Sequence, residues 1–335
     1  MLNFFYNDYE RRVRAFWRLL FQFVLYTLGT TILSSLVLLG FVLAGGMEFG
    51  EEIISRVVSS PAFLATGAVA SLVAVLVSVW VAGRFFDRRR SFSGFGLRPD
   101  REWWLDLGFG LFLGALLMTA IFLVELAAGW IEVTGTFERP GGGAFFPAII
   151  APVVLFLCVG IYEELLSRGY QLKNMAEGLN YPGLGPRGAV VVAWVISSSL
   201  FGLLHLANPN ATLVSTINIA FAGLLLGAGY VLTGRLGLPI GLHITWNFFQ
   251  GSVFGFPVSG RDALGATFIS IEQGGPALFT GGSFGPEAGL LDIAATIVGG
   301  LLIWLWVYAR SGKAPLQASI AEPPNGREDK APGGT

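Results

Sequence analysis

Two adjacent carboxylates near the middle of the chain, Glu163 and Glu164, end a run of uncharged, mostly apolar residues. Ionised carboxylates are costly to bury in an apolar setting, so such a pair marks a candidate functional site. If the segment is helical, Glu164 and Arg168 lie four residues apart, in the order that favours an ion pair. Glu163 lies about 100° further round the helix, without that partner. We therefore predict a structural role for Glu164 and a chemical role for Glu163.

The chain has two histidines, and each belongs to an i, i+4 pair within a hydrophobic segment: Phe201 with His205, and His243 with Asn247. Each pair shares one face of a helix. A histidine in a membrane helix often serves only to bond a neighbouring helix. Two histidines, a free glutamate and an amide on successive segments nevertheless form a set that can activate water and stabilise an oxyanion.

Two other hydrolytic arrangements conflict with the sequence. Neither histidine is followed by Glu, as a zinc helix of the His-Glu-x-x-His type requires. A pair of aspartates needs one depth, whereas Asp106 and Asp292 fall near opposite ends of their predicted spans. Glu163, His205 and His243 would still suit Zn²⁺ with room for water. The same three residues serve a metal-free mechanism, so both chemistries stay open at this point.

The composition of the chain indicates the class of protein to which these residues belong. Of the 335 residues, 53% are hydrophobic and 13% are charged, and the mean hydropathy is +0.66. The hydrophobic share is higher and the charged share lower than in soluble domains, which indicates a polytopic, integral membrane protein. A net charge of -1 offers no general attraction to nucleic acid. The single Cys158 lies in a hydrophobic segment, so an intrachain disulfide is impossible.

The hydrophobic runs predict an all-α bundle of about eight transmembrane helices. It forms one transmembrane domain over residues 1–310, with the motif-bearing core at about 145–256 and a polar, disordered tail at 311–335. An amphipathic or juxtamembrane helix is expected before the first span, and the long loop 260–287 is either a lid or a surface connection. The predicted spans are 19–44, 61–82, 103–129, 145 to beyond 163, 189–206, 211–233, 238–256 and 288–309.

Basic residues predict the orientation of this bundle. With eight spans, 18 of the 21 Lys and Arg residues fall on one side, and the other side holds only Arg56, Arg139 and Arg261. The positive-inside rule therefore predicts that both termini are cytoplasmic. Counting ~1.5 Å per residue from the inner surface puts Glu163 and His243 at a shallower depth than His205. Straight helices would not bring the three together, so the helix at 189–206 should start below the membrane plane, tilt strongly or lead into an inward-dipping loop at 208–210.

Taken in order, the three motifs resemble those of a known family. Glu163-Glu164-x-x-x-Arg168, Phe201-x-x-x-His205 and His243-x-x-x-Asn247 are similar to the motifs of the CPBP family, which contains the CAAX prenyl proteases and bacteriocin-processing enzymes and is also called the Abi family. The resemblance spans about 155–250. It implies an eight-span intramembrane endopeptidase whose site opens to the cytoplasm.

The resemblance also implies roles for the residues. Glu163 would be the general base that deprotonates water, and His205 would help to position that water. His243 and Asn247 would polarise the scissile carbonyl and stabilise the oxyanion, while Glu164, Arg168 and Phe201 would support the site. Substrates implied by the family are membrane-associated: prenylated CAAX peptides, bacteriocin precursors or membrane-tethered regulators. The cell membrane is the expected location.

Two other functions fit the same polar cluster. A non-catalytic membrane scaffold or immunity protein could keep it for structure, and a proton-coupled transporter could use carboxylates and histidines as a relay. Transporters often show repeated halves, and the sequence has no internal repeat.

Overall fold

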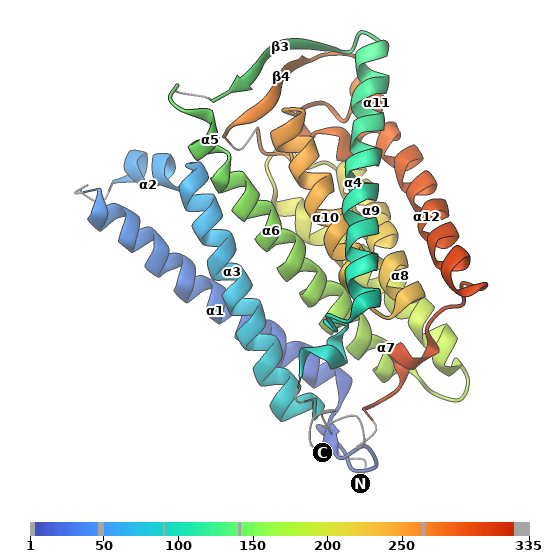
Figure 1. Ribbon diagram of the computed structural model, residues 1–335. Helices are drawn as coiled ribbons and strands as arrows, with labels where there is room; N and C mark the ends of the chain where they lie inside the picture. Colours follow the sequence, from blue (N-terminus) through green and yellow to red (C-terminus); the bar gives the residue numbers. More distant parts are fainter. Residues whose placement is uncertain (1–3, 46–49, 90, 140–141, 263–264, 325–335) are drawn as a thin grey trace.

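The protein is a helical bundle with a two-stranded ribbon at one end (Figure 1). The computed structural model describes residues 4–45, 50–89, 91–139, 142–262 and 265–324. Within these residues, seven helical segments are long and apolar enough to cross a membrane: Ala15–Ala44, Pro61–Asp87, Arg101–Ala127, Phe145–Leu179, Gly185–Ala207, Leu213–Thr233 and Leu290–Ser311. This confirms a polytopic, all-α membrane protein.

These segments contain the named elements of the bundle. The first three are α1 (Ala15–Ala44), α3 (Pro61–Ala82) with the π-helical turn η1 (Gly83–Asp87), and α4 (Arg101–Ala127). The fourth joins α5 (Phe145–Ala148), α6 (Ile150–Glu164), the π-helical η3 (Leu165–Leu172) and α7 (Lys173–Leu179). The fifth is α8 (Gly185–Leu204) with the 3-10 turn η4 (His205–Ala207), and the last two are α9 (Leu213–Thr233) and α12 (Leu290–Ser311).

The segment predicted as the seventh span is shorter than the others. It consists of α10 (Gly237–Phe248) and the π-helical η5 (Phe249–Val253). Most of α10 is buried, and it packs closely against α4 and α6. Glycines permit this approach: a Cβ at Gly110 or Gly241 would collide with the backbone of the opposite helix. Because protein rather than lipid surrounds α10, it needs neither the length nor the apolar surface of a lipid-facing span.

Both ends of the described chain contact α7. The N-terminal segment forms a small hairpin, β1 (Tyr6–Asn7) with β2 (Arg12–Val13), instead of the predicted amphipathic helix. Its Arg12 forms an ion pair of 2.5 Å with Glu177. At the other end, η8 (Ala318–Ala321) packs nearby, and Asn180 donates to the carbonyl of Ala321 at 3.0 Å. The two ends therefore lie at the same end of the bundle, as the seven spanning segments together with the shorter pass of α10 and η5 require.

The tail differs from the prediction of disorder from residue 311 onward. Ile320 and Ala321 are buried, and Gln317 bonds to the backbone of α9. Alternating apolar residues anchor this stretch although its composition is polar overall. The tail beyond residue 324 lies outside the described residues.

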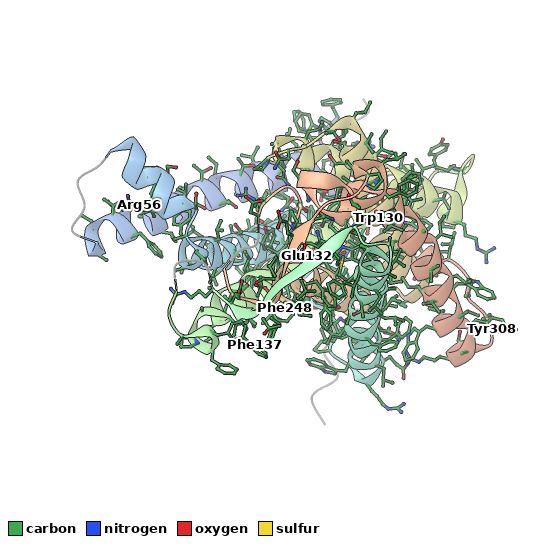
Figure 2. All side chains as sticks on the ribbon, turned by 90° about the horizontal axis from the view of Figure 1, so that it is seen from above. Arg56, Trp130, Glu132, Phe137, Phe248 and Tyr308 are labelled. Carbon is green, nitrogen blue, oxygen red and sulfur yellow. The ribbon has the colours of Figure 1, made fainter. Side chains whose placement is uncertain are left out.

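The opposite end of the bundle carries a ribbon that was not predicted; we call this the outer end, following the charge rule. Strands β3 (Ile131–Glu138) and β4 (Thr267–Gln273) pair antiparallel, with Ile131 opposite Gln273 and an irregularity between Val133 and Gly135. Viewed from above, β3 runs across the bundle from Trp130 to Phe137 (Figure 2). The described part of loop 260–287 contains β4, α11 (Ala277–Thr280), η6 (Gly282–Phe284) and the start of η7 (Pro286–Ala288).

Two short helices complete the described chain. Helix α2 (Glu51–Val58) connects α1 to α3 at the outer end, and the 3-10 turn η2 (Phe92–Phe95) lies between η1 and α4. Phe95 is buried in one of the two large apolar clusters, against Tyr170 of η3. The core of the bundle thus surrounds the segment that carries the adjacent carboxylates.

Candidate active site

A cavity of about 640 Å³ lies between α1, α3, α6, α8, α9 and α10. All four side chains predicted to do chemistry line it: Glu163, His205, His243 and Asn247. The residues predicted from the sequence thus come from three separate helical segments and meet at one cavity.

The adjacent carboxylates differ in environment as predicted. Glu164 is fully buried, and its Oε1 lies 2.8 Å from Nη1 of Arg168. Arg168 also donates to the carbonyl of Gly223 at 3.0 Å, and its guanidinium lies over the ring of Phe201, 4.5 Å from the centroid. Glu163 is 22% exposed and faces the cavity, where it is accessible to water. The ion pair thus leaves one carboxylate anchored and the other open.

Glu164 has a second contact that the sequence did not indicate. Its Oε1 also lies 2.8 Å from Nδ1 of His243. An ionised carboxylate only accepts hydrogen bonds, so Nδ1 is the donor and Nε2 is the nitrogen that faces the cavity. That Nε2 lies 3.9 Å from Oε2 of Glu163. Glu164 therefore orients the imidazole besides holding Arg168. Sequence spacing could not show this, because the two residues belong to different helices.

His205 is held by its own backbone. Its Nδ1 lies 2.7 Å from the carbonyl oxygen of Phe201, one turn earlier. Since a carbonyl oxygen only accepts, Nδ1 carries the proton and Nε2 is free toward its surroundings. The ring of Phe201 is a neighbour of both imidazoles, with centroid distances of 4.8 Å to His205 and 6.2 Å to His243. Phe201 thus packs against both histidines.

The depth conflict predicted from straight helices has a structural explanation. Glu163 is not near the inner end of its helix, because that helical segment runs on to Leu179. His205 begins the turn η4, after which Asn208 and Asn210 donate to the backbone of residues 259 and 260 at 3.1 Å. The longer helix moves Glu163 toward the middle of the bundle, and the turn ends α8 at the same cavity.

A metal site was left open by the sequence, and the donor geometry does not favour one. In the part of the chain that the structure describes, no three His, Cys, Asp or Glu side chains are grouped closely enough to hold a metal ion. Glu163, His205 and His243 line one cavity without converging on a point. We therefore derive no step through Zn²⁺.

Further polar residues reach the cavity from outside the three motifs. Ser259, Arg261 and Glu287 line it from the outer loop. Glu287 accepts from the backbone N–H of Ser259 at 2.6 Å and from its hydroxyl at 3.0 Å. Burial raises the pKa of the Glu287 carboxyl, while the donors of Ser259 and the nearby His205 oppose the increase. A glutamate in a Gly-rich loop carries no periodic signal, and we did not single it out from the sequence.

The comparisons agree with this geometry. Residues 145–249 match the family model described as type II CAAX prenyl endopeptidase Rce1-like. That segment begins at α5, ends at the junction of α10 and η5, and contains every predicted site residue. No curated protein and no solved structure matches the chain. Over residues 145–249, the chain is therefore similar to the Rce1-like type II CAAX prenyl endopeptidase family.

Proposed function

We propose that the protein is an intramembrane endopeptidase that uses Glu163 to activate water. One observation carries the proposal: Glu163 opens into a cavity that also holds two oriented imidazoles and an amide, while its neighbour Glu164 is engaged by Arg168 and His243. A carboxylate without a fixed cationic partner can accept a proton from water.

The reaction follows from these positions. Glu163 takes a proton as the water oxygen attacks the scissile carbonyl carbon, and His205, with its Nε2 free, helps to hold that water. His243 and Asn247 lie one turn apart on α10. With both ring nitrogens protonated, His243 donates Nδ1–H to Glu164 and Nε2–H to the carbonyl oxygen, and together with the amide of Asn247 it stabilises the negative charge that develops there. The proton on Glu163 then passes to the departing amine as the C–N bond breaks, which leaves a free carboxylic acid and an amine.

The substrate class is proposed from the family and from the cavity. Apolar residues of α1 and α3, including Phe23, Phe63 and Leu64, form one wall of the cavity. Such a wall suits a peptide that arrives from the membrane rather than from water. We propose membrane-associated peptides, with prenylated CAAX peptides as the first class to test, in the cell membrane.

Cleavage by purified protein tests the proposal. The substrate is a fluorogenic, farnesylated peptide in mixed micelles, and the variants are Glu163→Gln and His205→Ala. Loss of a general base lowers kcat by about a hundredfold to ten-thousandfold. Glu132→Gln is the matched control, because Glu132 lies on β3 (Figure 2), is exposed and does not line the cavity. Equal rates for the parent and for both site variants would refute the enzyme and favour a non-catalytic membrane scaffold.

A further inference from the structure

A third carboxylate belongs to the cavity although it lies outside the family match. Glu287 is in η7, 38 residues after the matched segment ends at Phe249, and only 4% of its surface is exposed. It lines the same cavity as Glu163, His205 and His243. A buried carboxylate requires partners that compensate for lost hydration, so its surroundings decide what it does.

The structure holds this carboxylate firmly in one place. Both donors of Ser259 bind Oε2. Burial raises the pKa of the Glu287 carboxyl, and the side chain of Gln250, which donates to the carbonyl of Pro257 at 2.6 Å, opposes that increase. Ser259 adopts a left-handed backbone conformation with φ of 48°, which is unfavourable for a residue with a side chain. The backbone N–H of Gly260 bonds to the carbonyl of Phe284 at 2.8 Å and fixes the turn against the segment before Glu287. A strained turn is thus retained where it presents two donors to one oxygen.

The same turn is joined to His205. Asn208, three residues after His205, donates to the carbonyl of Ser259 at 3.1 Å. The Glu287 carboxylate and the imidazole of His205 line the same cavity, and His205 opposes the increase in the pKa of the Glu287 carboxyl. Nδ1 of His205 is already bonded to Phe201, so the rest of the ring is free to respond to that charge.

We propose that Glu287 is a positioning residue that orients His205, and through it the attacking water, from the outer side of the cavity. This inference rests on the proposed peptidase function. In a water-poor cavity a fixed charge acts more strongly on its neighbour than it would in bulk water. The alternative is that Glu287 only anchors the outer loop through Ser259.

Kinetics separate these two roles. Glu287→Gln keeps the size of the side chain and an oxygen for Ser259 but removes the charge. Positioning predicts that kcat falls at least tenfold while KM stays within twofold. In the background of His205→Gln, the same change has less than a twofold further effect, because the residue through which it acts is gone. Glu272→Gln removes an equal charge from the exposed face of β4 and leaves the rate unchanged.

A spectroscopic measurement gives an answer that does not depend on activity. The chain has only two histidines, so ¹⁵N-histidine NMR in nanodiscs yields two imidazoles, which His243→Gln assigns. Glu287→Gln should shift the His205 nitrogens and leave those of His243 in place. Unchanged kcat, losses that add fully in the His205→Gln background, or unmoved His205 signals would each overturn the inference. A parent protein that cleaves nothing would refute the proposed function alone, and the spectrum would still decide whether Glu287 acts on His205.

Discussion

Removing the guanidinium of Arg168 should destabilise the bundle by about 3 kcal/mol. Arg168→Met preserves most of the stem but deletes the bonds to Glu164 and Gly223 and the contact with Phe201. Breaking a buried ion pair by removing one partner costs about 3–5 kcal/mol, because the remaining charge is left uncompensated. Glu164 keeps its bond to His243, which places the expected loss at the lower end of that range.

A double variant makes this reasoning testable. Glu164→Gln combined with Arg168→Met removes both charges, so it should be more stable than Arg168→Met alone by about 1–2 kcal/mol. The free energy of unfolding is measured in mixed SDS–detergent micelles by the fluorescence of the nine tryptophans. Arg101→Met is the control, because its side chain is 85% exposed and should contribute less than about 0.5 kcal/mol. A double variant less stable than Arg168→Met by the full cost of Glu164→Gln would refute the ion-pair argument.

Three further outcomes are expected. Treatment with EDTA should leave the cleavage rate within twofold of the untreated rate, since the described residues include no three-ligand group, and restoration of lost activity by Zn²⁺ alone would contradict this. Gly114→Ala should lower the free energy of unfolding by about 1–3 kcal/mol, because its Cβ would meet Leu242 on α10, whereas Gly108→Ala has open space and should be neutral or stabilising. Ile320→Asp should lower the melting temperature, because it places a charge in a buried contact of the tail, and an unchanged melting temperature would show that η8 is dispensable.

The spanning helices were predictable because lipid imposes a simple pattern. The long apolar runs predicted six of the seven spans nearly as observed, and the motif spacing predicted which side chains line the cavity. The fourth span was open-ended in the prediction, because the charged residues 163–177 look like the end of a helix. In the structure, Arg168 and Glu177 are buried because each pairs with side chains of opposite charge, and the helical segment continues to Leu179.

Features that depend on contacts between distant segments were not predictable. The bond from Glu164 to His243 crosses 79 positions, and that from Ser259 to Glu287 crosses 28. The β3–β4 ribbon pairs two stretches that flank the entire matched domain. Arg12 and Arg18 look like surface residues in the sequence, but both are buried in the structure because they pair with Glu177. Hydrophobic periodicity describes one helix or strand at a time, so it cannot predict contacts between residues of different elements.

The π-helical run η3 (Leu165–Leu172) gives the chain an unusual tolerance of a change in its length. The carboxylate pair lies directly before this run, and Glu177, which binds Arg12 and Arg18, follows its end. A π-helical turn holds more residues than an α-helical turn, so loss of one codon within η3 would restore ordinary α-helical winding and keep Glu177 close to its present orientation relative to Glu163. The same loss within the regular helix α6 would instead turn everything downstream by about 100° and separate Glu177 from its arginine partners.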